Sequence, residues 1–331
     1  MPGLRSHALT LGLLVFNGEE YLRETLDSLC NQTYTNFQLI ISDNASTDNT
    51  EEICRAYADR DTRIRYIRQP RNIGAIGNFN FLVSEAKSKY FKWCAADDLL
   101  APTFVERCIE FLENHPDFVL CHSRTVTIDG NGVPLENDII RSSGAAEAAN
   151  TLADVPPGPA SRFRNVLLGN TAVMDIWGVF RLEALRNAGA FQAYIGYEKV
   201  LMANVSLLGR IAELPESLFV YRVHPEQFSS QICASAQRNW VGSASDSKTY
   251  PWINYVKDYL NSVARADLRV TERARGYVAV VRYVFQVRKW HLILRSLFFG
   301  SNFGAGNAQL LKNHSPSAAS PAGHNSRGSR V

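Results

Sequence analysis

The chain has 331 residues, which is enough for one large domain or two small ones. Hydrophobic residues make up 46% of it and charged residues 20%, a balance typical of globular proteins rather than of disordered chains. The net charge of +3 is too small to indicate nucleic-acid binding.

The cysteines and the N-terminal residues bear on the cellular compartment. The six cysteines form no C-x-x-C pair and have no zinc-ligand spacing, and most lie in apolar runs. We therefore expect reduced core cysteines in a cytoplasmic protein. An apolar run follows Arg5 but passes directly into Asn17-Gly18-Glu19-Glu20, which argues against a cleaved signal peptide. No apolar stretch approaches the roughly 20 residues that a membrane-spanning helix needs.

Strand and helix patterns alternate through the first 125 residues. Short apolar runs predict strands, and apolar residues at helical spacing predict the helices between them. The pattern predicts strands at 9–16, 37–43, 64–68, 90–95 and 118–123, and helices at 20–30, 47–57, 77–86 and 103–114. Ser46 or Thr47 is the expected cap of the second helix. This alternation predicts right-handed crossovers and a mostly parallel sheet.

The rhythm breaks from about residue 129. Residues 130–165 are rich in Gly, Ala, Ser, Asn and Pro, which predicts a long loop or lid. Order returns over 166–224, with a helix near 181–187 and a strand at 218–223. Residues 252–300 look helical, and 301–331 have the composition of a disordered tail.

Polar turn residues follow four successive predicted strands. They are Asn17-Gly18-Glu19, the run from Asp43 to Asp48, Arg71-Asn72-Ile73-Gly74, and Asp97-Asp98. Because ligands bind beyond the carboxyl ends of strands in open α/β sheets, these residues together predict one polar crevice. Two adjacent carboxylates repel each other unless a cation lies beside them, so Asp97 and Asp98 indicate a divalent metal that holds a diphosphate. The alternative is that Asp98 caps the following helix.

The order and spacing of these segments resemble family 2 of the glycosyltransferases over residues 8–125, and more loosely to residue 225. The resemblance implies the GT-A fold, an α/β fold with a mostly parallel central sheet and flanking helices. It implies an enzyme that moves a sugar from a nucleotide-diphosphate donor to a hydroxyl and inverts the anomeric carbon. Residues 1–125 would be the nucleotide-sugar half and 126–225 the acceptor half. The glycine-rich loops of dinucleotide-binding and P-loop proteins are absent from the sequence.

The resemblance also implies donor-binding roles for the strand-end residues. Asp43 would accept a hydrogen bond from the nucleobase, and Arg222 would clamp the diphosphate oxygens. The expected donor-binding residues are Val15, Phe16, Asn17, Glu19, Asp43, Asn44, Ser46, Arg71, Asn72, Gly74, Asp97 and Arg222.

A metal site is the second implication of the resemblance. Asp97 matches the last acid of the family's Asp-x-Asp motif, whereas Ala95 stands at the place of the first acid. We expect Asp97, Asp98 and His224 to bind Mn²⁺ or Mg²⁺, which neutralises the leaving nucleoside diphosphate. Ala95 leaves open a catalytically inactive nucleotide-sugar-binding module. A nucleotidyltransferase is a further alternative, although the first loop, Asn17-Gly18-Glu19-Glu20, is acidic where such enzymes carry a basic, Gly-rich loop.

Inversion requires a base that takes the proton of the acceptor hydroxyl. Glu198 lies before an apolar helix, where related sequences carry an acid, and is the expected base. Lys199 follows it where many relatives have Asp, so a solvated Glu–Lys pair is the alternative. Asp175 is the second candidate base, and the nearby Trp177 would either stack on the acceptor sugar or pack in the core.

Within the predicted C-terminal helical region, 226–300, apolar residues at spacings of three and four form one stripe flanked by basic residues. The stripe comprises Val280, Tyr283, Val287, Trp290, Leu294 and Leu297. It predicts either docking on the catalytic domain or contact with an anionic membrane. We expect a cytoplasmic protein, or one peripheral at the inner face of the membrane, with no nucleic-acid partner. Membrane contact would suit a lipid-linked saccharide acceptor in cell-surface polysaccharide or glycolipid synthesis.

Overall fold

The computed structural model describes residues 7–140, 156–169, 174–194, 196–225, 227 and 251–286. The predicted tail, 301–331, lies outside the described residues. So do the last four members of the predicted C-terminal stripe, Val287, Trp290, Leu294 and Leu297.

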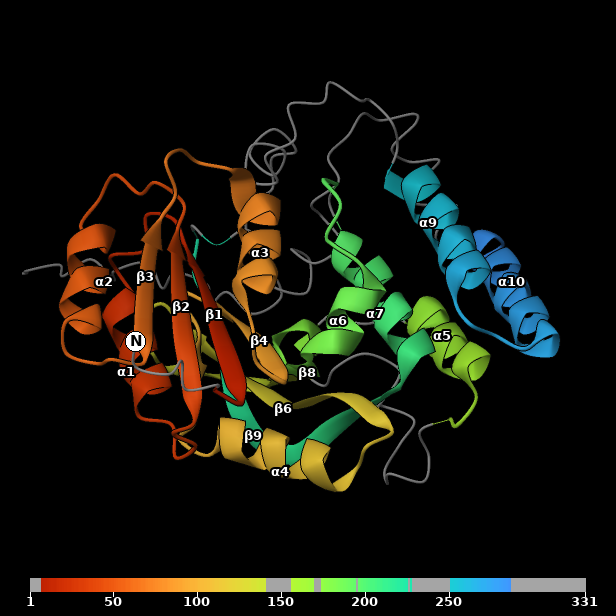
Figure 1. Cartoon of the computed structure of the whole chain (residues 1–331), viewed down its shortest axis with the longest axis horizontal. Coiled ribbons are helices and arrows are strands. Elements are labelled where there is room, and N and C mark those ends of the chain that lie inside the picture. Colours follow the sequence, from red (N-terminus) through yellow and green to blue (C-terminus); the bar gives the residue numbers. More distant parts are fainter. Residues whose placement is uncertain are drawn as a thin grey trace, which may run out of the picture.

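A single mixed sheet runs through the described part of the molecule (Figure 1). Its strand order is β3-β2-β1-β4-β8-β6-β9-β5, with β7 paired to β6. The strands are β1 (Leu9–Val15), β2 (Phe37–Asp43), β3 (Ile64–Arg68), β4 (Tyr90–Ala95), β5 (Leu99–Leu100), β6 (Phe118–Asp129), β7 (Pro134–Ile140), β8 (Val179–Arg181) and β9 (Arg210–Val223). The first four strands along the sheet are parallel, as predicted, whereas β8 runs antiparallel to β4 and β6.

The helices divide between the two faces of the sheet. They are α1 (Leu22–Cys30), α2 (Thr50–Ala58), α3 (Gly74–Glu85), α4 (Phe104–Asn114), α5 (Pro159–Leu168), α6 (Leu182–Ala188), α7 (Tyr197–Leu208), α9 (Pro251–Arg265) and α10 (Val270–Val284). Buried residues of α1, α2 and α4 form one core cluster, and those of α3, α5–α7, α9 and α10 form the other. In Figure 1, α2 and α10 lie at opposite ends of the molecule.

The strand β4 is buried on both faces, which is why its sequence is a nearly continuous apolar run. Its alternate residues Tyr90 and Cys94 enter the α1/α2/α4 cluster, while Phe91 and Trp93 enter the other cluster. Each of these four side chains is at most 5% exposed. A strand buried on both faces has no polar side to show in its sequence.

Several segments differ from the sequence-based expectation. The helix α3 begins at Gly74 rather than at residue 77, and β9 begins at Arg210 rather than at residue 218. The helix α2 begins at Thr50 rather than at residue 47, because Asp48 Oδ1 accepts the N–H of Thr50 and Ser46 Oγ accepts the N–H of Asn17. The predicted loop 130–165 contains the first turns of α5 and strand β7, which forms a hairpin with an extended β6. Its polar centre, Glu136-Asn137-Asp138, hides the strand pattern.

The C-terminal helices α9 and α10 pack on the rest of the molecule. Val280 and Tyr283, the first two members of the predicted stripe, are 1% and 6% exposed and belong to the core cluster of α5 and α7. Glu272 on α10 accepts the N–H of Ala160 at the start of α5 (3.0 Å). Across the described residues, every helix is too short or too polar to traverse a bilayer.

Candidate active site

The central strand β1 brings the ends of β2 and β4 to one edge of the sheet. Val15 lies opposite Asp43 on β2, and Leu14 lies opposite Ala95 on β4, both in parallel register. The loops that carry Asp43 and Asp97 are therefore two strand spacings apart, about 10 Å. The sheet thus places the predicted strand-end residues along one edge.

The loops after β1 and β2 are bonded to each other. The N–H of Asn17 donates to Ser46 Oγ (2.9 Å), and Glu19 Oε2 accepts both the backbone N–H (3.0 Å) and the side-chain amide (2.6 Å) of Asn49. Asn17 and Ala45 have φ values of 50° and 62°, a region that L-residues seldom adopt. The fold therefore holds a strained pair of turns at this edge. Phe16, beside them, is 48% exposed, whereas Val15 is buried.

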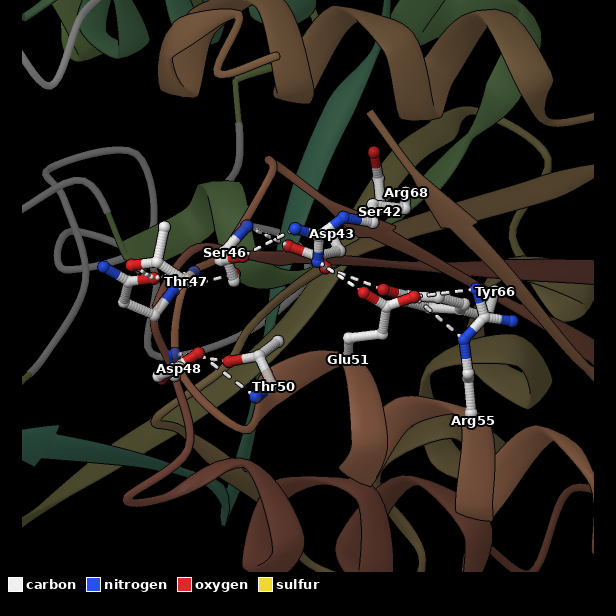
Figure 2. Close-up of polar contacts among 12 residues, drawn as sticks. Ser42, Asp43, Ser46, Thr47, Asp48, Thr50, Glu51, Arg55, Tyr66 and Arg68 are labelled. Atoms are coloured by element: carbon white, nitrogen blue, oxygen red, sulfur yellow. Dashed lines mark hydrogen bonds and ion pairs between the residues drawn. The ribbon is translucent and has the colours of Figure 1, made fainter. Parts of the chain in front are cut away.

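Asp43 is buried in a polar network that Figure 2 shows. Its Oδ2 accepts hydrogen bonds from Tyr66 Oη (2.7 Å) and Arg68 Nη1 (3.0 Å), and its Oδ1 accepts the N–H of Ser46 (2.9 Å). Arg68 also pairs with Glu51 (2.9 Å), and 35% of its side chain is exposed. Desolvation and the bond to Asp43 raise the pKa of Tyr66 above its ordinary value. Both carboxylate oxygens of the buried Asp43 are therefore bonded within the protein, and its hydrogen bond to a nucleobase stays a prediction.

Asn44 joins this network to the loop after β3. Its Oδ1 accepts the N–H of Ile73 (2.8 Å), and its Nδ2 donates to Asn72 Oδ1 (2.9 Å). Gly74 adopts a φ of 73°, which suits glycine, and its N–H also donates to Asn72 Oδ1 (2.8 Å). Arg71 is exposed beside these residues. Three predicted donor-binding residues thus hold one loop in place, and Arg71 remains accessible to a ligand.

Asp97 and His224 form the second polar cluster of the edge. Asp97 Oδ2 lies 3.0 Å from His224 Nε2, and their side chains are 29% and 10% exposed. The His224 ring packs on Tyr21, with ring centroids 4.8 Å apart. The structure therefore brings together two of the three predicted metal ligands.

Asp98 turns away from that pair into the protein. It is 6% exposed, and its Oδ1 accepts the backbone N–H of Arg222 (3.0 Å). Burial, and then the charge of Asp97, raises its pKa well above the ordinary value. Strand β5 separates Asp98 from α4, whose N-cap is Thr103, so the helix-capping alternative for Asp98 does not hold.

The donor atoms of Asp97 and His224 fit a divalent metal. The 3.0 Å between Asp97 Oδ2 and His224 Nε2 is a hydrogen-bond distance, and a carboxylate oxygen and an imidazole nitrogen are both atoms that divalent cations accept as ligands. Within the described ranges, no three His, Cys, Asp or Glu side chains cluster in a way that could hold a metal. A cation at this pair would therefore need further oxygen ligands from a bound diphosphate and water.

Arg222 is bonded to the protein at several positions. It is 1% exposed, its Nη2 pairs with Glu24 Oε2 (2.6 Å), and its Nε and Nη1 donate to the carbonyls of Asp97 (3.0 Å) and Gly130 (3.2 Å). Its guanidinium lies over the ring of Tyr21, 4.6 Å from the centroid. These contacts differ from the expected diphosphate clamp: Arg222 joins β9, α1 and the Asp97 loop.

The two candidate bases have different surroundings. Asp175, in the 3₁₀ helix Met174–Trp177, is 1% exposed, with its Oδ1 3.7 Å from Nε2 of the buried His122. Glu198 lies in the first turn of α7 and is partly exposed, and burial raises the pKa of its carboxyl. Glu198 is therefore better placed than Asp175 to meet an acceptor. Trp177 packs near Phe79 and Phe219, at ring-centroid distances of 6.2 and 6.4 Å.

Sequence analysis did not identify four side chains that contribute to this edge: Tyr21, Glu24, Tyr66 and Arg68. Arg68 carried a usable signal, because it ends β3 directly opposite Asp43 in the parallel register. Glu24 carried none, since its partner Arg222 lies 198 residues away along the chain.

The sequence is similar to known glycosyltransferases. Residues 11–169 match the model described as Glycosyl transferase family 2. A Haemophilus influenzae protein described as an uncharacterized glycosyltransferase is 29% identical over 223 residues, which are 65% of this chain and 65% of that protein. The aligned part of this chain thus spans just under two thirds of that relative.

Two solved structures share the fold at 16% identity. S. aureus TarS in complex with UDP-GlcNAc has a TM-score of 0.58 over 83% of this chain and 71% of that one. The Pyrobaculum calidifontis mannosyltransferase in complex with GDP-Man and Mn²⁺ has a TM-score of 0.50 over 94% and 80%. The predicted GT-A fold is therefore confirmed, and over residues 11–169 the chain belongs to glycosyltransferase family 2.

Proposed function

We propose that this chain moves a sugar from a nucleotide-diphosphate donor to a hydroxyl acceptor, with inversion at the anomeric carbon and with Mn²⁺ or Mg²⁺. The observation that carries the proposal is the pairing of Asp97 with His224 on the same sheet edge as the Asp43 network. A diphosphate bound at the Asp97–His224 pair would place its nucleoside toward the Asp43 network. The ligands named for the two structural neighbours, UDP-GlcNAc and GDP-Man with Mn²⁺, are of this chemical class.

The residues at the edge have separable roles in this proposal. Asp97 and His224 would hold the cation, and Arg222 would keep the Asp97 loop in place through its bond to the Asp97 carbonyl. The cation, when bound, would neutralise the charge that gathers on the leaving diphosphate. Arg68 would offer a hydrogen-bond donor to a carbonyl oxygen of a nucleobase, while Tyr66 donates its one hydroxyl hydrogen to Asp43.

Glu198 would act on the acceptor side. It would take the proton of the acceptor hydroxyl as that oxygen bonds to the anomeric carbon and the bond to the diphosphate breaks. Burial raises the pKa of Glu198, which makes its carboxylate a stronger base than that of an exposed glutamate. Burial raises the pKa of Glu198 by more than the charge of the exposed Lys199 lowers it.

The acceptor and its pathway are also part of the proposal. A lipid-linked saccharide at the inner face of the membrane is the acceptor class we favour, in the synthesis of cell-surface polysaccharide or glycolipid. In this scheme, residues 1–125 bind the donor, 126–225 bind the acceptor, and the C-terminal region contributes the membrane contact.

The test is a turnover assay with a matched pair of variants. Purified chain is incubated with UDP-, GDP- or dTDP-sugars and Mn²⁺ or Mg²⁺, and nucleoside diphosphate release is measured with and without saccharide acceptors. Asp97→Asn should abolish release, whereas Asp98→Asn should retain it, because Asp98 faces inward and accepts only from a backbone N–H in the network described above. Donor binding without turnover would support the inactive binding module that Ala95 leaves open. Equal activity of both variants would contradict the metal assignment.

A further inference from the structure

The outward face of α10 is apolar along its whole length. Val270, Tyr277, Val278, Val281 and Phe285 are 82%, 36%, 51%, 52% and 71% exposed. At 100° per residue they fall within an arc of about 100° on the helix surface. We call these five residues the α10 stripe. The opposite side of the same helix is the one that packs in the core.

This concentration of exposed apolar side chains is unusual for the molecule. Of the ten large hydrophobic residues that are exposed in the described ranges, seven lie on or directly after α9 and α10. A contiguous exposed apolar surface of this kind marks a site of interaction with a protein or a membrane. The helix lies at one end of the molecule, away from α2 (Figure 1).

The charges beside the stripe select the partner. Arg282 is exposed, and Arg275 is 71% exposed at the side-chain level, although it also pairs with Glu272 (2.7 Å). Glu272 itself is 16% exposed at the side-chain level and faces α5. Residues 273–331 contain nine Lys or Arg and no Asp or Glu. Acids near the start of the stripe are the exposed Asp267 and the partly buried Glu272. An apolar helical face flanked by arginines, whose second half lies in a segment without acids, complements an anionic surface that has an apolar interior.

We infer that the α10 stripe binds the surface of an anionic lipid bilayer, with its apolar side chains in the interfacial region and the arginines against lipid phosphates. A second copy of the chain is the alternative occupant, and the light-scattering measurement below distinguishes it from a bilayer. The inference rests on one part of the proposed function, the membrane contact of the C-terminal region, and identifies the residues that make it. Its test requires no donor or turnover, so its failure is distinguishable from a failure of the proposed sugar transfer.

The test is vesicle co-sedimentation of the full chain. Vesicles of phosphatidylcholine, with and without phosphatidylglycerol, are compared at low and high salt. Phe285→Asp should weaken binding to the anionic vesicles about tenfold or more, since one large apolar side chain and its transfer energy are lost. Arg282→Gln should weaken it about fivefold at low salt and less at high salt. Leu208→Asp, a matched change at a 42% exposed leucine on α7, should bind like the wild type.

Three outcomes would overturn the inference. Equal binding of Phe285→Asp and Leu208→Asp would show that the stripe does not touch the bilayer. Equal binding to neutral and anionic vesicles would remove the charge argument. A wild-type dimer in light scattering that becomes monomeric on Phe285→Asp, without vesicle binding by either, would assign the stripe to a second copy.

Discussion

The turn before α7 offers the sharpest test of the packing around the candidate base. Gly196 has a φ of 83°, and a Cβ at this position would lie 2.0 Å from Tyr255 Oη and 3.0 Å from Tyr255 Cζ. The left-handed backbone costs an alanine about 1–2 kcal/mol. The overlap with the tyrosine adds about 1–3 kcal/mol. Gly196→Ala should therefore lower the free energy of unfolding by about 2–5 kcal/mol.

A double-mutant cycle separates these two costs. Tyr255→Phe removes Oη, the atom that the new Cβ would overlap. The double variant should therefore recover the stability lost to the overlap and keep only the backbone cost of about 1–2 kcal/mol. The single Tyr255→Phe variant measures what the hydroxyl itself contributes. Urea unfolding of the four proteins, with linear extrapolation, gives the coupling energy.

The cycle also has a functional readout. Glu198 lies two residues after Gly196, in the first turn of α7, so Gly196→Ala should lower kcat more than it lowers donor affinity. The reasoning is refuted if Gly196→Ala unfolds within about 0.5 kcal/mol of the wild type, the range typical of neutral surface changes. Additive effects of the two substitutions would equally exclude the predicted contact.

Three further predictions concern the site. Glu198→Gln should lower kcat about a hundredfold or more while donor binding persists, and an unchanged rate in steady-state assays would move the base role to Asp175. For the wild type, kcat/KM should fall as pH drops through the pKa of Glu198. Because burial raises that pKa, the acid limb of a pH–rate profile should lie above about 4.3, the pKa typical of an exposed glutamate. An acid limb at or below that pH would contradict the assignment of Glu198 as the base. Arg222→Met should lower the free energy of unfolding, measured by urea titration, by about 2–4 kcal/mol, because it leaves the carbonyls of Asp97 and Gly130 without this donor. Glu24→Gln should lower it by less than about 1 kcal/mol, because the Glu24 side chain is 59% exposed. Equal losses would mean that the hydrogen bonds to the two carbonyls contribute little to stability.

Much of the parallel half of the fold could be predicted from the sequence. Strands β2, β3 and β4 have the predicted bounds, because burial on both faces leaves uninterrupted apolar runs between polar turns. Strand β7 was missed because a polar strand beside β6 lacks that pattern. The order of strands beyond β4 was equally hidden, since β8 has only three residues and inserts between β4 and β6.

The candidate site was predictable as a location but not as a set of contacts. The turn residues after β1, β2 and β4 meet at one edge because parallel neighbours end together. The inward orientation of Asp98 follows from its bond to the Arg222 backbone, and the role of Arg222 follows from its pairing with Glu24. Both depend on contacts between residues more than 100 positions apart, which a local pattern does not contain.

In the proposed function, the sheet edge binds a nucleoside diphosphate through a cation held by Asp97 and His224. Isothermal titration of UDP and GDP into the wild type and into His224→Gln, with Mn²⁺ and then with EDTA, measures this directly. At least one nucleotide should bind in the presence of Mn²⁺, and EDTA or the substitution should weaken this binding about tenfold or more. Equal affinity in all four conditions, or no binding of either nucleotide by the folded wild type, would contradict this proposal.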